Sequence, residues 1–562
     1  MYILGISAFY HDSAAALIQD GKVIFAVEEE RFTRIKHDNA FPFQAVKACL
    51  AYKNLAINDI SYIAYYEKPL LKFERILETF VQTYPFSLQP FLEAIPQWLG
   101  EKIKVADTIK KRLGYKGQVY FVNHHLSHAS ASYYPSPFKE SAILTADATG
   151  EYQTTGLWYG KGTSIKLLKE INFPHSLGLL YSTFTAFLGF RVNEDEYKVM
   201  GLAAYGKPRL ANEIRKVIDM KDDGSFKLDM NYFAFRESFT MWSKKFEKLF
   251  GKSRKPNEPI KEIHKDLAAS IQTITEETYF KILNHLYSLT KSQNLTIGGG
   301  VALNALANGK IYHNTSFKNV YIIGSSGDSG GAIGAALFAY HSVLGKTKRS
   351  LVGNLCLGSS FDNDETETIL KQYKLSYRKF DNEDLLLTTI ANLLNKGHII
   401  GWFQGRMEFG PRALGGRSIL AKPNPYSMKD KVNRIKIREL FRPFAGSVLA
   451  ENVHEYFDVP EKKYFSPFMT FCFPVKKGKT KNLAAIVHED GTCRIQTVNK
   501  DNGRYYKLIK TFYKITEIPC ILNTSFNLKG EPIVETSQQA IEDFLKTNLD
   551  YLVIGDYLIN KD

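Results

Sequence analysis

The sequence is poor in cysteine and has no long apolar run. Its five cysteines are odd in number and widely spaced, with no CxxC pair, which argues against a disulfide framework or a structural zinc site. No apolar stretch approaches the ~20 residues that cross a bilayer, so no membrane partner is expected. The first residues reach His11 and Asp12 too soon for a secretory signal. These absences predict a soluble, cytoplasmic protein.

Blocks of basic residues are also absent, although the chain is basic overall. It has 73 Lys and Arg against 58 Asp and Glu, a formal charge of +15, but no run of cations typical of a nucleic-acid-binding arm. The excess suits an anionic partner, and nucleic acid, anionic lipid and phosphorylated metabolites all fit that description. A local cluster of cations lies between Lys429 and Arg442.

The length of the chain predicts two domains. Single cores stop growing at roughly 250–300 residues, and the chain has 562. A stretch rich in Gly, Ser, Asp and Asn follows residue 345, so we expect one α/β domain over 1–350 and a second over 351–562. Residues 66–115 combine helical periodicity with many aromatics. We expect a helical insertion there, which either packs against the core or forms a lid.

A strand, a polar loop and a hairpin occur twice in the first half. The first copy lies within 2–27, where Asp20-Gly21 is a strong hairpin signal. The second copy lies within 141–168. The repetition predicts a duplicated hairpin unit whose polar loops face each other and offer backbone N–H groups to a phosphate.

Three histidines occur in the segment HHLSHA at 124–129. His124 and His128 would share one face of a helix, close enough to bind one metal ion, and His125 with His128 is the alternative pair. Asp147 ends an apolar strand, and Asp328 lies in a Gly/Ser loop before a small-residue helix. Two imidazoles and two carboxylates suit Fe(II), Mn(II) or Zn(II). These residue types alone leave the metal open.

A run of three glycines, Gly298, Gly299 and Gly300, follows an apolar strand and precedes Asn304. Glycine permits close approach of the backbone to a ligand, and helix N-termini bind anions. The run is therefore a candidate nucleotide site. Tight packing between a helix and a strand would require the same glycines.

The most distinctive segment interleaves arginine with glycine over 404–420. It contains Arg406, Arg412 and Arg417 among four glycines. Arginine presents a rigid fork to phosphate or carboxylate, and glycine lets an anion reach the backbone. A solvated helix would explain the later basic segment around 435–445, but it does not explain this interleaving.

Together these motifs resemble the NodU/CmcH family of O-carbamoyltransferases, which includes the TobZ-like enzymes of antibiotic biosynthesis. The resemblance spans nearly the whole chain. Where the family often continues FRPFAPSV, this chain has Gly446 in place of the proline. The motifs that carry the resemblance are HDSAAAL at 11–17, EEERFTRIKHD at 28–38, HHLSHA at 124–129, EYKVMGLAAYG at 196–206, GGGVALN at 298–304, GRMEFGPRALGGRSIL at 405–420, FRPFA at 441–445 and LNTSFN at 522–527.

The resemblance implies an α/β fold with two parts. The N-terminal domain would be of the actin, Hsp70 and sugar-kinase (ASKHA) type, similar to TsaD-like enzymes, and the C-terminal domain would be YrdC-like. In such enzymes the C-terminal domain uses carbamoyl phosphate and ATP to form carbamoyladenylate. The N-terminal domain then transfers the carbamoyl group to a hydroxyl of a small-molecule acceptor, such as a natural product or a sugar.

The resemblance also implies site residues. His124, His128, Asp147 and Asp328 would bind a divalent metal, Fe(II) in this family. The catalytic residues would be His11, Lys36 and Arg412. The acceptor hydroxyl needs a general base, and the candidates are His11 and a histidine of 124–128 that does not bind the metal. The binding of ATP and carbamoyl phosphate would draw on a larger set: Gly298, Gly299, Gly300, Asn304, Arg406, Arg412, Arg417, Lys436, Arg438, Arg442, Asn523 and Ser525.

Two other functions are compatible with the sequence. A tRNA-modifying threonylcarbamoyl transferase would use the +15 charge to hold tRNA. The Gly–Arg segment in a fused second domain favours small acceptors instead, so nucleic acid is not expected as a partner. The other alternative is a non-catalytic nucleotide-binding protein. The identity of the acceptor stays open, and a homodimer is compatible with the sequence.

Overall fold

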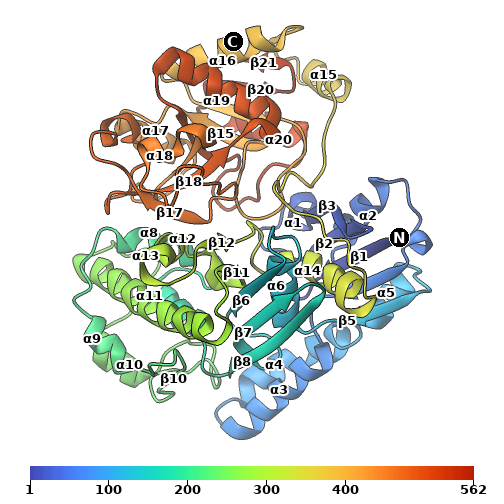
Figure 1. Cartoon of the computed structure of the whole chain (residues 1–562), viewed down its shortest axis with the longest axis vertical. Coiled ribbons are helices and arrows are strands. Elements are labelled where there is room, and N and C mark those ends of the chain that lie inside the picture. The colour runs from blue at the N-terminus through green and yellow to red at the C-terminus, as the bar shows by residue number, and fades with distance from the viewer. Residues whose placement is uncertain (562) are drawn as a thin grey trace. The chain divides into compact units, whose positions relative to one another are not determined.

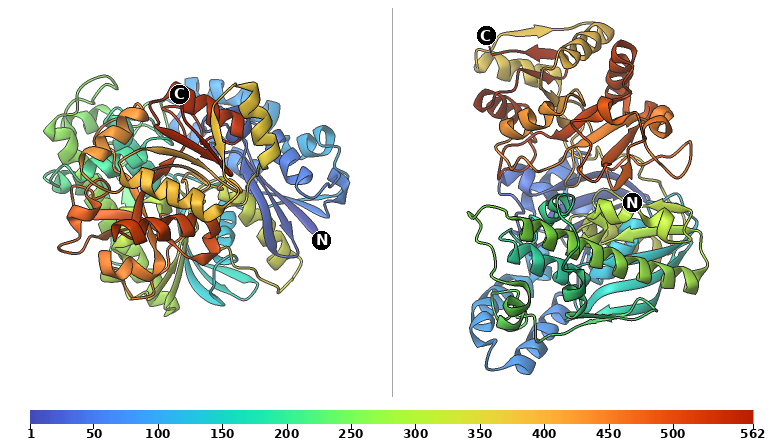
Figure 2. Two further views of the ribbon diagram at one scale, coloured as in Figure 1. Left: turned by 90° about the horizontal axis from the view of Figure 1, so that it is seen from above. Right: turned by 90° about the vertical axis from the view of Figure 1, so that its left-hand side faces the viewer.

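The computed structural model describes residues 1–561, and these group into two compact units. The first unit comprises Met1–Ala26 and Asn39–Val352, and the second comprises Val27–Asp38 together with the chain from Gly353 onward. Both units combine helices with β-sheet (Figures 1 and 2). No helix within 1–561 has the length and apolar character needed to cross a membrane.

The first sheet of the first unit has the strand order β3-β2-β1-β4-β5. Its first strand, β1, pairs antiparallel with β2 on one side and parallel with β4 on the other, and β5 continues parallel to β4. The bounds are β1 (Tyr2–Ser7), β2 (Ala14–Gln19), β3 (Lys22–Glu28), β4 (Tyr62–Tyr65) and β5 (Gln118–Phe121).

The second sheet repeats this arrangement with the order β8-β7-β6-β11-β12. Here β6 pairs antiparallel with β7 and parallel with β11, and β12 is parallel to β11. The duplicated order is that of the ASKHA fold, which confirms the predicted fold class of this part and its repeated hairpin. The bounds are β6 (Glu140–Ala146), β7 (Gln153–Lys161), β8 (Ser164–Asn172), β11 (Asn294–Gly298) and β12 (Asn319–Tyr321).

Small residues let two helices pack closely in the first unit (Figure 1). Helix α6 (His124–Tyr133) packs on β6 and β11, α14 (Gly330–Phe338) packs on β1 and β2, and the two helices pack on each other. A Cβ atom on Gly334 would lie 1.9 Å from the Ser127 carbonyl oxygen. The crossing therefore requires glycine, and it fixes the start of α6 close to the start of α14.

Helices fill the connections between the strands of the first unit. The chain between β4 and β5 forms α3 (Pro69–Thr83), α4 (Leu88–Gln97), η2 (Trp98–Lys102) and α5 (Val105–Arg112), drawn in blue in Figures 1 and 2. The long helix α11 (Glu262–Thr290) packs against α7, α8 and α9. The other elements are η1 (Ile57–Asp59), α2 (Phe43–Ala51), α7 (Leu177–Phe187), α8 (Glu196–Ala203), α9 (Ala211–Arg215), β9 (Ile218–Met220), β10 (Phe226–Leu228), α10 (Lys244–Phe250), η3 (Gly300–Leu303), α12 (Ala305–Gly309), α13 (Ile311–Asn314) and η4 (Ala339–Val343).

The second unit is built on a mixed sheet with the order β13-β21-β20-β14-β15-β19-β16-β18-β17. Helices α16 and α19 pack on it over a core that includes Leu386, Trp402 and Ile509. The strands are β13 (Tyr377–Lys379), β14 (Ile400–Phe403), β15 (Arg417–Ala421), β16 (Ala445–Leu449), β17 (Phe471–Pro474), β18 (Thr492–Val498), β19 (Cys520–Ser525), β20 (Tyr551–Ile554) and β21 (Tyr557–Ile559). The helices are α1 (Glu30–Thr33), α15 (Asn363–Gln372), α16 (Glu383–Asn395), α17 (Ser427–Ile435), η5 (Ala450–Asn452), α18 (Val453–Tyr456), η6 (Thr480–Leu483), η7 (Lys500–Asn502), α19 (Gly503–Thr516) and α20 (Ser537–Lys546).

Candidate functional site

Four predicted metal ligands come together in the first unit. His124 and His128 are one turn apart on α6, Asp147 follows the end of β6, and Asp328 lies in the turn before α14. One ligand atom from each of the four lies within 4.8 Å of all the others. The packing of α6 against β6 and α14 explains this convergence, since it brings the start of both helices to the end of the strand.

The distances within this cluster are short. His128 Nε2 lies 2.9 Å from Asp147 Oδ2 and 3.3 Å from Asp328 Oδ1. His124 Nε2 lies 3.3 Å from the same Asp147 oxygen and 3.1 Å from His128 Nε2. Two imidazole nitrogens and two carboxylates thus point at one small volume, which is the donor set of a site for Fe(II), Mn(II) or Zn(II).

The electrostatics of the cluster favour a bound cation. The ligand residues are buried, with Asp328 2% exposed and both histidines 1% exposed. Burial opposes charge on His128, but the hydrogen bonds and charges of Asp147 and Asp328 raise its pKa to about 10. Burial also opposes charge on Asp147, yet the two histidines hold its pKa well below its usual range. Within residues 1–561, Asp328 Oδ2 has no hydrogen-bond partner, so the residues present fit a metal ion.

The neighbouring His125 does not join the cluster. Its Nδ1 lies 2.9 Å from Thr145 Oγ1, which also accepts a hydrogen bond from the Trp158 indole. Burial and the nearby His124 and His128 hold the pKa of His125 well below its usual value. Of the two histidine pairs that the sequence left open, the structure therefore brings together His124 and His128.

Glu151, which was not among the predicted residues, holds the start of α6. Its buried carboxylate accepts hydrogen bonds from the backbone N–H of His124, at 3.0 Å, and of Lys68, at 2.8 Å. A carboxylate at the first turn of a helix satisfies donors that lack intrahelical partners and complements the helix dipole. An acidic residue four positions after Asp147 in a polar loop was the available signal.

The glycine run lies against the metal cluster. A Cβ on Gly298 would lie 2.6 Å from the His128 carbonyl, and one on Gly299 would lie 2.3 Å from the Ala146 carbonyl. These two glycines are therefore needed for packing. At Gly300 the nearest atom would be Asp147 Oδ1, at 3.0 Å, so this position borders the cluster itself. Nucleotide binding by the run stays a prediction.

Asn304 and His11 have specific partners in the first unit. Asn304 caps α12 through Ala307 N–H and pairs its amide with Gln272. His11 Nδ1 lies 3.0 Å from Asp12. Burial lowers the pKa of His11, but Asp12, and to a lesser extent Asp328 and Asp147, raise it to about 9. A histidine with this pKa is charged at neutral pH, which suits proton donation or anion binding better than a general base.

In the second unit, Arg412 of the Gly–Arg segment lies near two other arginines, Arg442 and Arg494. Burial and, to a lesser extent, the charge of Arg494 lower the pKa of Arg412 to about 9. Burial and Arg442 likewise lower the pKa of Arg494, against the opposing effect of Cys472. Like charges at such proximity repel one another, and an anion bound between them would relieve that repulsion. Arg494 was not among the predicted residues.

Two buried glutamates hold the loop that carries Arg412. Glu408 Oε1 accepts hydrogen bonds from the backbone N–H of Leu414 and Gly416, at 2.7 and 2.6 Å. Glu28 Oε1 accepts from Gly410 N–H at 2.6 Å, and Arg31 donates to the Gly410 carbonyl at 2.9 Å. The loop is thus fixed on both sides of Arg412.

Lys436 lies near the predicted cations Arg438 and Arg442 and contacts the LNTSFN segment. Its ammonium donates to the Ser525 carbonyl and, at 2.9 Å, to the Asn527 carbonyl. Burial holds its pKa well below the usual value, and Arg438, Arg442 and, more weakly, Lys36 lower it further. Arg438 lies over the Phe444 ring at 4.2 Å. These cations therefore share one region of the second unit with the 525–527 turn.

Three further predicted residues make structural contacts. Arg417 donates to the carbonyls of Gln404, Gly405, Gly416 and Ser359. Arg406 donates to Leu357 and Gly358, and Asn523 Nδ2 lies 3.0 Å from Ser447 Oγ. These bonds hold the backbone around the Gly–Arg segment. Ligand binding by Arg406, Arg417 and Asn523 stays a prediction.

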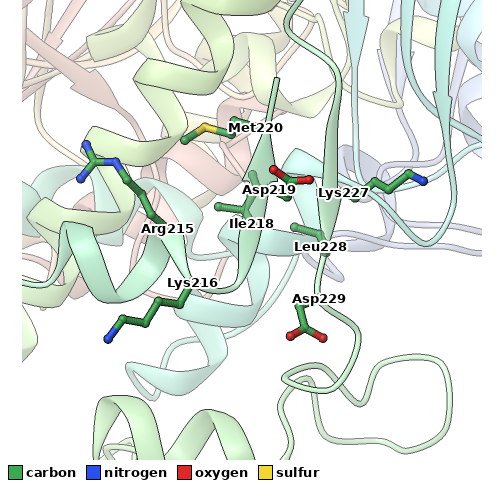
Figure 3. A pocket seen from close by; sticks show the side chains of 8 residues that line it. All are labelled: Arg215, Lys216, Ile218, Asp219, Met220, Lys227, Leu228 and Asp229. Atoms are coloured by element: carbon green, nitrogen blue, oxygen red, sulfur yellow. The ribbon is translucent and has the colours of Figure 1, made fainter. Parts of the chain in front are cut away.

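A surface cavity of about 410 Å³ lies elsewhere in the first unit, at the β9–β10 hairpin. Figure 3 shows that Lys216 and Lys227 extend in different directions from it. Asp219 pairs with Lys221 at 2.7 Å and Arg215 with Glu277 at 2.5 Å. The charged side chains of this cavity point apart or form ion pairs, whereas those of a catalytic site point toward a common centre.

Comparison with known proteins gives family matches in both halves of the chain. Residues 2–337 match the family described as "Carbamoyltransferase N-terminus", and residues 391–561 match "Carbamoyltransferase C-terminus". The chain is 44% identical to protein sll1178 of Synechocystis sp., over 100% of this chain and 97% of that protein. It is 37% identical to nodulation protein NolNO of Sinorhizobium fredii, over 99% of this chain and 80% of that protein.

Among solved structures, HypF of T. kodakarensis shares 11% identity with a TM-score of 0.34, over 62% of this chain and 48% of that one. The family matches cover both units and contain the metal cluster and the arginine-rich loop. This chain therefore belongs to the carbamoyltransferase family.

Proposed function

We propose that this carbamoyltransferase is an ATP-dependent O-carbamoyltransferase that works in two steps. Carbamoyl phosphate first loses phosphate to water and gives carbamate. A carbamate oxygen then attacks the α-phosphorus of ATP, pyrophosphate leaves, and carbamoyladenylate forms. In the second step the hydroxyl oxygen of a small-molecule acceptor attacks the carbamoyl carbon, AMP leaves, and the hydroxyl proton passes to a base.

The crowding of Arg412, Arg442 and Arg494 is the observation that carries the first step. Carbamate, phosphate and ATP are all anionic and repel one another, so a site that joins them needs fixed positive charge. Cations that are already in place stabilise charge on phosphate oxygens most effectively where water is excluded. Arg412 is partly buried and its loop is fixed by Glu28 and Glu408, which suits this role.

The buried cluster of two histidines and two aspartates supports the second step in the first unit. A divalent metal such as Fe(II), held by His124, His128, Asp147 and Asp328, would supply a Lewis acid there. Glu151 orients the start of α6 and hence both histidines. His11, charged at neutral pH, would attract the phosphate of a bound adenylate or donate a proton to it.

Pyrophosphate release from ATP tests the first step. The wild-type enzyme should release pyrophosphate only when carbamoyl phosphate is present. Arg412→Ala should lower this rate by about 100- to 1,000-fold, the usual effect of losing a fixed charge-stabilising group. Arg434→Ala, which removes an exposed arginine of the same basic segment, is the matched control and should keep the rate. Normal release by the Arg412 variant would contradict the assignment.

A further inference from the structure

Arg75 is a buried cation whose Nε has no hydrogen-bond partner within residues 1–561. The residue lies on α3 and is 8% exposed, with its guanidinium 4.6 Å from the centre of the Phe173 ring. Within residues 1–561, no hydrogen bond or ion pair joins this guanidinium to another side chain or carbonyl. Burial lowers the pKa of this guanidinium, while Tyr10 and the carboxylates of Glu67 and Glu151 raise it without forming an ion pair. Hydrogen-bond donors left unused in a buried group destabilise a fold, so these donors suit a ligand.

Two further cations, Lys72 and Lys102, belong to the same helical segment as Arg75. Lys72 forms an ion pair with the buried Glu67 at 2.5 Å and lies 5.1 Å from the centre of the Tyr10 ring. Burial lowers the pKa of Lys102, and Lys72 lowers it further. Glu67 pairs with Lys72 and Glu151 accepts backbone N–H groups, so neither carboxylate binds the Arg75 guanidinium.

The start of the Arg75 helix lies close to the start of α6, the helix that carries His124 and His128. Glu151 accepts the N–H of Lys68, at the start of α3, and the N–H of His124, at the start of α6. Arg75 is seven residues beyond Lys68, a distance of about 10 Å along a helix. Burial chiefly, and then the charges of Asp328 and Asp147, raise the pKa of Tyr10. Tyr10 in turn raises the pKa of Arg75, so Tyr10 lies near both regions.

We propose that Arg75 recognises a carboxylate or phosphate on the hydroxyl acceptor, so that the acceptor of this enzyme is an acidic alcohol such as a uronic acid or a sugar phosphate. This inference rests on the proposed carbamoyl transfer at the metal cluster. The guanidinium fork pairs bidentately with either oxyanion. The rings of Phe173 and Tyr10 offer apolar faces against which the carbon skeleton of such an acceptor can pack.

The test uses the full chain and a metabolite extract of the source organism. Wild-type enzyme, ATP and carbamoyl phosphate are incubated with the extract, and species that gain a carbamoyl group are identified by mass spectrometry. The wild-type product should bind to an anion-exchange resin at neutral pH through its own acidic group. With the purified acceptor, Arg75→Ala should raise KM by about 10- to 100-fold, the usual effect of losing a charge-assisted hydrogen bond, while Arg75→Lys should recover part of the loss.

Two controls separate binding from folding and from net charge. Lys111→Ala removes one positive charge from the exposed side of α5 and should leave KM for the acceptor unchanged. Pyrophosphate release that depends on carbamoyl phosphate should be the same in wild type and Arg75→Ala, because the activation step does not use this residue. Equal melting temperatures of the Arg75 variants and wild type would show that the fold is retained.

Several outcomes would overturn the inference. A neutral or cationic carbamoylated product would do so, as would pyrophosphate release by wild type without any carbamoylated acidic product. An unchanged KM for the acceptor in Arg75→Ala would also overturn the inference. A raised KM for ATP in this variant would overturn it too, because Arg75 would then bind the nucleotide phosphate. Failure of wild type to release pyrophosphate would contradict the proposed function itself. Pyrophosphate release therefore distinguishes a wrong proposed function from a wrong role for Arg75.

Discussion

Adjacent histidines on α6 have different partners because of where a helix directs its side chains. His124 and His128, four residues apart, point to Asp147 and Asp328, whereas His125 points to Thr145. The spacing predicted both possible pairs. Only the packing of α6 on β6 and α14 decides between them, since it determines which face of the helix meets the carboxylates.

Metal content tests this distinction directly. His128→Ala removes one of the four ligand residues. The affinity for Fe(II) should therefore fall by at least about 100-fold, since even the loss of a partner behind a ligand costs about 10- to 100-fold. Metal analysis of the purified protein after dialysis measures the effect. His125→Gln is the matched control, because it changes a buried histidine of the same helix that lies outside the cluster. Retention of stoichiometric metal by the His128 variant would contradict the ligand assignment.

At the scale of elements, a short segment from the start of the chain completes the second unit. Glu28, at the end of β3, and Arg31, in α1, bind the backbone N–H and C=O of Gly410 respectively. Arg34 of the same segment donates to the carbonyls of Pro532 and Ile533. One segment thus contacts both the Gly–Arg loop and the loop that follows LNTSFN.

Breaking this contact should impair the activation step. Arg31→Ala leaves Glu28 buried without its partner, and loss of one member of a buried pair costs about 3–5 kcal/mol. We expect the Gly410 loop to loosen and pyrophosphate release to fall by about 10- to 100-fold. Steady-state assays with a melting curve measure both effects. Lys22→Ala, at the exposed start of β3, is the control, and an unaltered rate in Arg31→Ala would refute the positioning role.

Elements that depend on local sequence signals could be predicted, whereas contacts between residues far apart in the chain could not. The duplicated hairpins were predictable because their turns and apolar alternation are local signals. The roles of Glu28 and Glu408 were not, because a carboxylate that accepts backbone N–H groups has the same sequence pattern as a solvated one. The separation of 382 positions between Glu28 and Gly410 leaves no local signal. Glu151 and Arg75 were missed for the same reason.

At the scale of the whole molecule, the chain carries two chemically different sites in two units. The cationic loop around Arg412 suits the activation of a small anion, and the histidine–aspartate cluster suits a metal. The second unit is discontinuous, since it takes residues 27–38 from within the first. The N-terminal motif EEERFTRIKHD is therefore part of the unit that contains the Gly–Arg loop.

The division of chemistry between the two units is tested most directly by measuring carbamoyladenylate in the His128→Ala enzyme. With ATP and carbamoyl phosphate, quenched reactions analysed by mass spectrometry should contain carbamoyladenylate, and the variant should accumulate it without forming carbamoylated acceptor. Wild type should convert it onward. Absence of carbamoyladenylate from both enzymes, with ATP left intact, would contradict the account.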